Sequence, residues 1–407
     1  MNVETIGNVM LAASLVSLGV SAAIAAQPVT TVTVDCSRGD TIANALAGNE
    51  RKPLLVLVRG ACNESVSVSK DDITLRGDAG SGAAINGPDP AIDTVTVSAN
   101  RVTVENLSIG GGRNGITALG AGMFTVRGTT VQSTGRNGVV YAAGSSGTIE
   151  TCTIQSNGRD GVSVEAASVT IINSTISNNT RNGVLVSVGG AARIGVDNRN
   201  GAAGNFIRQN AANGIVISGG GYALIAMNEI TGNGVDAAQP ARSGISVVEA
   251  RADLVGGNTI TGHPAQGLFT RASSVQIGGP ALGFSTVNAF SENGALNNVG
   301  GIFAFLGSSL VVRDAVIRNN FGFGLGFSLR SQGQMFNTSI QNNSGDGIRL
   351  ILGSVLLPST PTSTVSNNTG VGVQCFDAES SVVNTFLPIM SIFGNPGGDV
   401  SPGCTPF

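Results

Sequence analysis

A short pattern of apolar and polar positions repeats along most of this chain. Each repeat has an aliphatic residue, a polar residue three positions later and, after four more positions, a glycine that begins an apolar–variable–apolar segment such as Val162–Val164. This alternation is typical of a short β-strand with one buried face. The glycine recurs at eleven positions, mostly 22 or 23 residues apart: Gly115, Gly138, Gly161, Gly183, Gly214, Gly244, Gly267, Gly301, Gly324, Gly347 and Gly372.

A period of this length indicates a solenoid, in which each repeat buries its apolar face only against its neighbours. Asn-Gly and Asp-Gly pairs are expected to supply left-handed backbone at the corners. The polar position should stack from coil to coil as a hydrogen-bonded ladder. Its residues are Thr134, Asn157, Asn179, Asn210, Asn233, His263, Asn293, Asn320, Asn343 and Asn368. Gly, Asn, Ser, Thr and Val replace the helix formers that a helical repeat would need, so we predict an all-β fold.

The repeat Asn-x-x-Ile-x-x-Asn-x-x-x-Gly-Val-x-Val resembles the parallel β-helix repeats of pectate-lyase-like proteins. It is also similar to the secreted bacterial right-handed β-helix region group. The resemblance covers most of residues 54–375. It implies a right-handed, single-stranded parallel β-helix with three short sheets and about 22–23 residues per coil. Lyases, hydrolases, epimerases, tailspikes and adhesins share this scaffold, so the resemblance indicates the fold and leaves the function open.

The N-terminal segment predicts export from the cell. An apolar run from Val9 to Ala26 ends in Ala-Ile-Ala, which is typical of a signal peptide over residues 1–26, although no Lys or Arg precedes the run. We therefore expect a secreted, periplasmic or cell-surface protein that keeps no membrane segment after cleavage. Its low charge, 12% charged residues and a net charge of −3, gives no general attraction to nucleic acid.

The two ends of a solenoid expose unpaired strands, so each needs a cap. Residues 27–53 are assigned to an N-terminal cap, where Asp40 is expected to begin a short capping helix, and residues 376–407 to a C-terminal cap. Four of the five cysteines flank the solenoid, and two disulfides at its ends are the simplest interpretation. These cysteines are Cys36, Cys62, Cys375 and Cys404; Cys375 could instead be a buried thiol, and Cys152 is expected to be unpaired and buried.

An arginine precedes each of the first four repeat glycines by two positions: Arg113, Arg136, Arg159 and Arg181, with Arg242 repeating the pattern later. Equivalent positions on adjacent coils lie about 4.8 Å apart, so these side chains should form one column. Such a column suits an extended polyanion, because arginine grips carboxylates and sulfates with two hydrogen bonds. Asp160 is the acidic residue nearest to it. The alternative is that the arginines fan out into solvent or cover neighbouring coils.

Two further outward rows have simpler interpretations. Glu105, Arg127 and Glu150 alternate in sign on adjacent coils and are expected to form an ion-pair ladder. An apolar row should be covered by inserted loops or form a partner surface: Val140, Leu185, Val216, Phe269 and Phe303, with Phe305 nearby. The only histidine, His263, occupies the ladder position, so we assign it to stacking and expect no metal site.

The motifs of known β-helix enzymes do not occur here as a set. We find no register in which three acidic residues stack to hold Ca²⁺, and a chain with no Trp and two Tyr is poorly suited to neutral glycans. We therefore favour a non-catalytic β-helix that binds an extended acidic polysaccharide through the arginines, without a cofactor. The alternatives are a polysaccharide lyase, for which Ca²⁺ would become relevant, and a structural adhesin. We expect the inserts at 189–205, 235–241 and 278–298 to wall the site, while the oligomeric state stays open.

Overall fold

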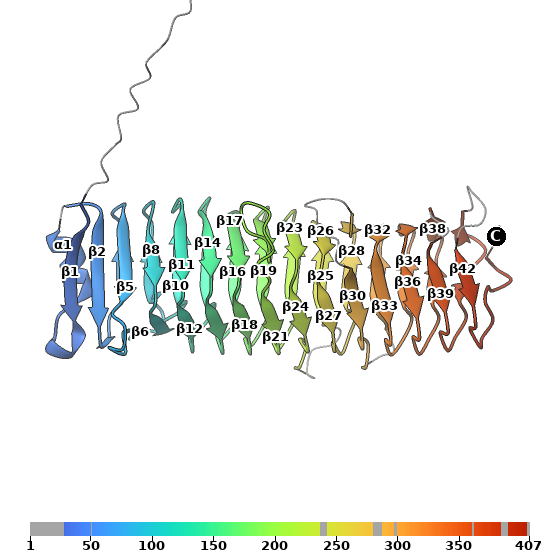
Figure 1. Cartoon of the computed structure of the whole chain (residues 1–407), viewed down its shortest axis with the longest axis horizontal. Helices are drawn as coiled ribbons and strands as arrows, with labels where there is room; N and C mark the ends of the chain where they lie inside the picture. The colour runs from blue at the N-terminus through green and yellow to red at the C-terminus, as the bar shows by residue number, and fades with distance from the viewer. Residues whose placement is uncertain are drawn as a thin grey trace, which may run out of the picture.

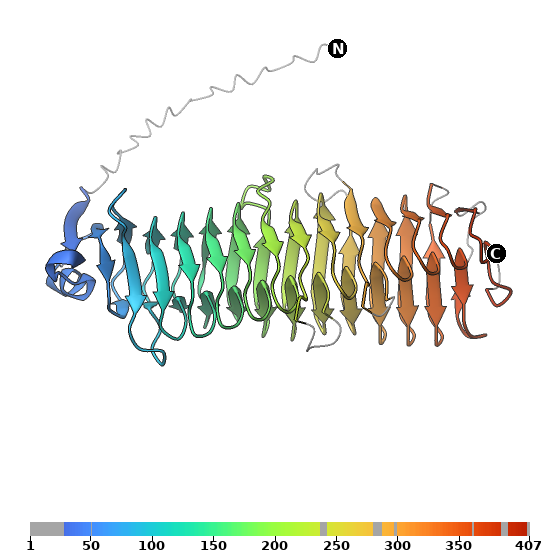
Figure 2. The same cartoon turned by 90° about the horizontal axis from the view of Figure 1, so that it is seen from below.

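The computed structural model is a right-handed parallel β-helix built from three parallel sheets, as predicted (Figures 1 and 2). Each coil passes through sheet A, sheet B and sheet C in turn, and every sheet runs along the length of the molecule. The predicted signal peptide lies outside the described residues. The structure describes residues 28–49, 51–236, 242–279, 287–296, 299–359, 362–383 and 390–404.

Sheet A contains fifteen strands in chain order. They are β1 (Thr30–Asp35), β2 (Leu54–Arg59), β5 (Ile73–Gly77), β8 (Thr103–Glu105), β11 (Phe124–Arg127), β14 (Ser146–Glu150), β17 (Ser168–Ile172), β20 (Ala191–Ile194), β23 (Tyr222–Ala226), β26 (Arg251–Gly256), β29 (Ser274–Ile277), β32 (Ser309–Arg313), β35 (Gln332–Phe336), β38 (Val355–Pro358) and β41 (Ser381–Val382).

Sheet B contains fourteen strands. They are β3 (Ala61–Cys62), β6 (Ala84–Gly87), β9 (Ser108–Gly111), β12 (Thr130–Gln132), β15 (Thr153–Gln155), β18 (Thr175–Ser177), β21 (Phe206–Arg208), β24 (Glu229–Thr231), β27 (Thr259–Thr261), β30 (Asn288–Ser291), β33 (Ala315–Arg318), β36 (Ser339–Gln341), β39 (Thr364–Ser366) and β42 (Ser391–Phe393).

Sheet C contains thirteen strands. They are β4 (Val66–Val68), β7 (Val95–Val97), β10 (Ile116–Leu119), β13 (Val139–Ala142), β16 (Val162–Glu165), β19 (Val184–Ser187), β22 (Ile215–Ser218), β25 (Ile245–Val248), β28 (Leu268–Arg271), β31 (Ile302–Phe305), β34 (Leu325–Ser328), β37 (Ile348–Ile351) and β40 (Val373–Cys375).

The core is a set of stacked aliphatic rows inside the coils. In sheet B, Ile154 pairs in register with Val131 on one side and Ile176 on the other, and all three side chains are fully buried. Each strand has side chains alternating between the interior and the outer surface, so one residue of each type repeats at every level. Residues that are one repeat apart in the sequence therefore lie next to one another on adjacent coils.

The predicted ladder lines the corner between sheets B and C. Asn157 donates through Nδ2 to Oδ1 of Asn179 at 2.9 Å, and Asn179 donates in the same way to Asn210 at 2.9 Å. The backbone N–H of each residue also bonds to the next side chain, as between Asn157 and Asn179 at 3.1 Å. These buried amides satisfy one another, which makes the ladder a structural element.

A second ladder, which the sequence pattern did not reveal to us, lines the corner between sheets A and B. Asn205 donates to Asn228 at 2.9 Å, Asn228 to Asn258 at 3.1 Å, and Asn258 to Asn288 at 2.8 Å. All four are buried. Each stands two positions before the buried apolar residue of its repeat, which is isoleucine in three coils and Phe290 in the fourth, so the signal was present in the sequence.

The repeat glycines do not supply left-handed backbone, and that expectation was wrong. The φ angle of Gly138 is not positive. A Cβ atom at this position would lie 2.6 Å from Cγ2 of Ile154 and 2.7 Å from the carbonyl oxygen of Gly161. Glycine is required there because the coils approach closely. The left-handed residue comes just before the ladder position instead, for example Ser156 with φ 55° and Asn178 with φ 56°.

A short helix lies at the N-terminal end of the described β-helix, and a disulfide lies at each end. Helix α1 (Ile42–Gly48) follows the short 3₁₀-helix η1 (Cys36–Arg38) and buries Ile42 and Leu46. Its N-cap is Thr41, not the predicted Asp40, and Glu64 accepts two backbone N–H bonds of its first turn. Two disulfides close the ends, Cys36–Cys62 and Cys375–Cys404, and Cys152 is a buried free thiol.

Part of the predicted ion-pair row forms on the outer face of sheet A. Glu105 pairs with Arg127 on the next coil, and with Arg76 on the preceding one. Although burial alone would raise the pKa of Glu105, the two guanidinium groups hold it below its usual value. Glu150 lies in register with Arg127 on the following coil, and its charge acts on that guanidinium without a direct ion pair.

Candidate functional site

The arginines stack at the corner where sheet B passes into sheet C. The backbone N–H of Arg136 donates to the carbonyl of Arg113 at 2.6 Å, that of Arg159 to Arg136 at 2.8 Å, and that of Arg181 to Arg159 at 3.0 Å. The backbone of this row, which we call the arginine column, is therefore continuous over four coils. The column borders the outer face of sheet C, whose strands begin three residues after each arginine.

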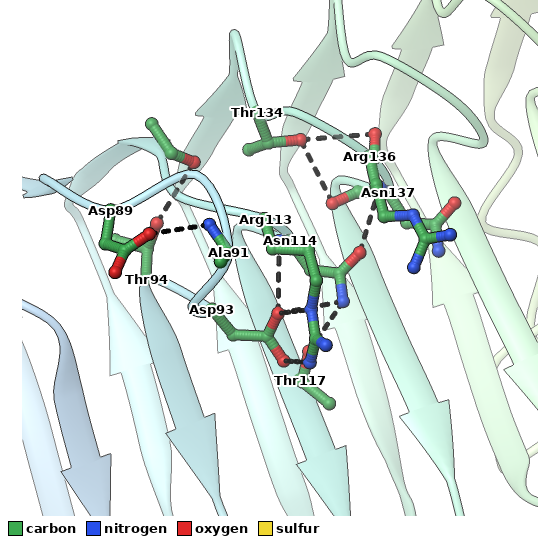
Figure 3. Close-up of polar contacts among 11 residues, drawn as sticks. Asp89, Ala91, Asp93, Thr94, Arg113, Asn114, Thr117, Thr134, Arg136 and Asn137 are labelled. Atoms are coloured by element: carbon green, nitrogen blue, oxygen red, sulfur yellow. Dashed lines mark hydrogen bonds and ion pairs between the residues drawn. The ribbon is translucent and has the colours of Figure 1, made fainter.

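The first member of the column is committed to an ion pair. Nε and Nη2 of Arg113 lie 2.8 Å and 3.1 Å from the two carboxylate oxygens of Asp93, which is buried (Figure 3). Burial by itself would raise the pKa of Asp93, but the hydrogen bonds and charge of Arg113, with help from Thr117 and Asn114, hold it below its ordinary value. Sequence analysis missed this partner because Asp93 belongs to an earlier coil that lacks the repeat pattern.

The middle of the column is not neutralised. In Figure 3 the side chain of Arg136 points away from the Asp93 cluster. Among the residues that the structure describes, no acidic side chain forms an ion pair with Arg136 or Arg159. Two positive charges therefore stand side by side, one coil apart, on the surface.

Asp160 lies beneath the column as part of a third ladder. Its Oδ1 accepts both the backbone N–H of Asn182 at 3.1 Å and the side-chain amide of Asn182 at 2.8 Å. The carboxylate is 3% exposed, and its Oδ2 lies 3.6 Å from Nη1 of Arg181. The ladder continues through Asn137 and Asn213. Asp160 is thus next to the arginines, as expected, but its acceptor atoms face the turn.

A pocket interrupts the column between Arg181 and Arg242. Ala212 occupies the arginine position on the coil between them, and its backbone N–H donates to the carbonyl of Arg181 at 2.7 Å. The small side chain leaves a hollow of about 540 Å³. We call it the Ala212 pocket. The residues lining it are Arg181, Asn182, Leu185, Ser187, Ala212, Asn213, Val216, Ser218 and Arg242.

The electrostatics of the pocket favour an anion. Burial lowers the pKa of Arg242, the charge of Asp236 opposes this shift, and the positive charge of Arg181 has a smaller lowering effect. The two guanidinium groups therefore repel each other across the hollow only in part, because Asp160 lies beside Arg181 and the charge of Asp236 acts on Arg242. A carboxylate or sulfate group placed between them would relieve this repulsion and accept hydrogen bonds from both.

The floor of the pocket combines apolar and polar groups. Leu185 and Val216 pair in register on β19 and β22 and point outward. Ser187 and Ser218 flank them on the same strands. An apolar floor bordered by hydroxyls, amides and cations matches the faces and edges of a sugar ring that bears an acid group.

The outward apolar row has no single explanation. Val140 is only 7% exposed and is covered. Leu185 and Val216 line the Ala212 pocket, and Phe269 and Phe303 lie half-buried in an aromatic cluster further along sheet C.

The inserted loops do not gather on one face, so that expectation was wrong. The insert after β20 lies at the corner between sheets A and B, where Figure 2 shows it as a green loop. The insert after β29 begins at that same corner, whereas the one after β24 begins at the corner between sheets B and C. Of this last insert, residues 237–241 lie outside the described residues.

Family comparison agrees with the architecture. The family described as right handed beta helix region matches residues 58–200, 161–279 and 270–387, and the chain belongs to this family. No curated protein matches the chain. Among the described residues, no helix is both long and apolar enough to cross a membrane.

Comparison with solved structures finds matches at low identity. The Azotobacter vinelandii mannuronan C-5 epimerase AlgE6 A-module is 14% identical with a TM-score of 0.56, covering 84% of this chain and 94% of that one. The AlgE4 A-module of the same organism is 14% identical with a TM-score of 0.41, covering 88% and 91%. An alginate lyase from Paenibacillus sp. is 15% identical with a TM-score of 0.30, covering 91% and 97%. At its identity, the likeness to the AlgE6 A-module shows the fold alone.

Proposed function

We propose that this protein is a secreted, non-catalytic β-helix that binds an extended acidic polysaccharide on the outer face of sheet C. The observation that supports this most directly is the Ala212 pocket, where two arginines face each other across a hollow with an apolar floor. The disulfides at both ends are typical of proteins from oxidising compartments and support export.

The spacing of the charges favours a polymer over a small anion. Arg181 and Arg242 are two coils apart, or about 9.6 Å along the axis. Their long side chains can converge on one acid group in the pocket. Arg159 and Arg136 continue the row at one-coil intervals beyond Arg181, so a chain with an acid group on successive sugars would meet a cation at each step.

Neutral polysaccharides lack the group that this site is built to bind. Desolvating two arginines without supplying an anion costs free energy, and the repulsion between them would stay. The hydroxyls and amides of the pocket alone offer weak, exchangeable hydrogen bonds. We therefore expect discrimination by charge.

Binding to alginate, polygalacturonate and heparin, with dextran as the neutral polymer, tests the proposal. Substituting Arg181 and Arg242 together by Ala should weaken binding of the acidic polymers about tenfold or more. The control substitutes Arg208 and Arg318, two exposed arginines on sheet B, and removes the same charge from another face. Equal losses in both variants would reduce the effect to net charge and overturn the proposal.

Catalysis is tested in the same samples. New absorbance from unsaturated sugar ends, measured with and without Ca²⁺, would assign the protein to the lyases instead. Constant absorbance together with arginine-dependent binding is the result that we expect.

A further inference from the structure

An aromatic cluster lies on the outer face of sheet C, beyond the Ala212 pocket. Phe269 projects from β28, and Phe303 and Phe305 project from β31. Their ring centroids are 6.3 Å apart for Phe269 and Phe303, 6.4 Å for Phe269 and Phe305, and 5.9 Å for Phe303 and Phe305. All three are half-buried, so each ring keeps a surface open to solvent.

The packing around the cluster holds the rings in place. Phe323 is buried with its centroid 5.5 Å from that of Phe303. The next residue in the outward row is Gly326, where a Cβ would lie 2.9 Å from Cζ of Phe323 and 3.0 Å from Cδ2 of Phe303. Only glycine lets these rings lie over the sheet, so the cluster is a formed platform.

A cation stands beside this platform without an ion-pair partner. Arg271 pairs in register with Phe305 and is exposed. Among the residues that the structure describes, it forms no ion pair. Arg349, on the far side, is different: it binds Asp346 at 2.9 Å and stacks on Phe323 at 5.2 Å. Arg271 is therefore the cation that is available to a ligand.

The platform is continuous with the Ala212 pocket. The outward row runs in register from Leu185 through Val216, Ser246 and Phe269 to Phe303. Phe269 is two coils from Val216, so about 9.6 Å separates the pocket floor from the first ring. A polymer that lies in the pocket along the axis of the β-helix passes directly over Phe269.

We propose that Phe269, Phe303, Phe305 and Arg271 form a second subsite for the same acidic polysaccharide. The rings stack on the apolar face of a sugar further along the chain, and Arg271 binds its acid group. This inference rests on the proposed function. It adds that the ligand is a polymer whose sugars have an open apolar face, and that affinity grows with chain length until both subsites are filled.

Oligouronates of increasing length, titrated by calorimetry, test this subsite. Two double variants remove the rings: Phe269→Ala/Phe303→Ala, and Phe269→Leu/Phe303→Leu, which keeps more apolar volume. The control is Phe206→Ala, which removes an exposed phenylalanine from sheet B. Short oligomers that fill only the pocket should bind all of these equally. Longer oligomers should bind the wild type and the Phe206 variant more tightly, whereas both double variants should lose about fivefold to tenfold.

The outcomes separate the two proposals. If the double variants keep the wild-type dependence on length, the second subsite is wrong while the pocket stands. If Arg181→Ala/Arg242→Ala leaves every length unaffected, the proposed function fails as well. If the double substitutions change the oligomeric state seen by sedimentation but leave oligouronate binding unchanged, the platform is a contact between copies of this chain and the inference is overturned. Thermal unfolding of each variant shows that the fold is intact.

Discussion

The Nδ1 atom of His263 accepts a hydrogen bond at 3.1 Å from the backbone N–H of Asn233, which stands 30 positions earlier in the chain. On the other side of the ring, Nε2 lies 3.0 Å from the carbonyl oxygen of Ile230. The imidazole is therefore neutral, with its proton on Nε2, and it replaces an asparagine amide in the ladder. This geometry confirms the structural role that the sequence predicted for the only histidine.

The buried histidine should make stability depend on pH. Burial lowers its pKa from 6.5 to about 4, so the unfolded state takes up a proton more readily than the folded one. Its contribution is fully present above pH 6.5 and is lost as the pH falls toward 4, by about 3 kcal/mol at roughly 1.4 kcal/mol per pKa unit. His263→Asn should remove this dependence, which thermal unfolding between pH 4 and 7 would measure. The same slope in wild type and variant would contradict the assignment.

The asparagine ladder should be a strong contributor to stability. Asn320→Ala removes the acceptor of the backbone N–H of Asn293, and it removes one donor to the carbonyl of Phe290 and one to Oδ1 of Asn343. We expect a loss of about 3 kcal/mol or more, because buried polar groups lose their bonds together. Gln341→Ala, on the outer surface of the next coil, is the control and should cost less than about 1 kcal/mol. Hydrogen exchange at the Asn293 amide reports the local opening, and equal protection in both variants would argue against the ladder.

The disulfides should hold the ends of the solenoid. Replacing Cys375 and Cys404 by Ser removes a cross-link that spans 29 residues, which is expected to cost about 3 kcal/mol and to fray the last coils first. Thiol counting checks the pairing directly. The native protein should show no reactive thiol, because Cys152 is buried with its pKa raised to about 11, and the denatured, unreduced protein should show one. Three reactive thiols would mean that one end is open.

Much of the fold could be predicted because the place of a residue within its repeat determines its place on the coil. The ladder residue three positions after Ile154 identifies the corner between sheets B and C, and Arg136 and Arg159 stack because each keeps the same distance from its glycine. The paired ladder at the other corner, beginning at Asn205, could have been found by the same reasoning.

The site itself was harder to predict. The Ala212 pocket arises because alanine replaces the repeated arginine on one coil. No repeated residue therefore marks the pocket in the sequence. The partner of Arg113 is Asp93, which comes before the regular repeats begin. The loop inserts could be located by length, but the corner from which each leaves depends on the strand that it follows.

Asp160→Asn separates a structural aspartate from one that contacts a ligand or acts in catalysis. Asparagine already fills this position in the neighbouring coils, at Asn137 and Asn182, so stability should change by less than about 1 kcal/mol. The substitution also removes the carboxylate beside Arg181, so binding of acidic polymers should stay equal or become a few-fold tighter. Loss of binding in a variant that melts like the wild type would place Asp160 in the ligand site.

The central claim is that the gap at Ala212 is the binding site, and filling the gap tests it most directly. Ala212→Arg adds a positive charge but closes the hollow between Arg181 and Arg242, and Ala212→Leu closes it without charge. Affinity for polygalacturonate should fall about tenfold in both variants. Because Ala212 is buried, thermal unfolding of each variant must show that the fold is intact. If Ala212→Arg instead binds as tightly as the wild type, or more tightly, the ligand follows charge alone and the pocket is not its site.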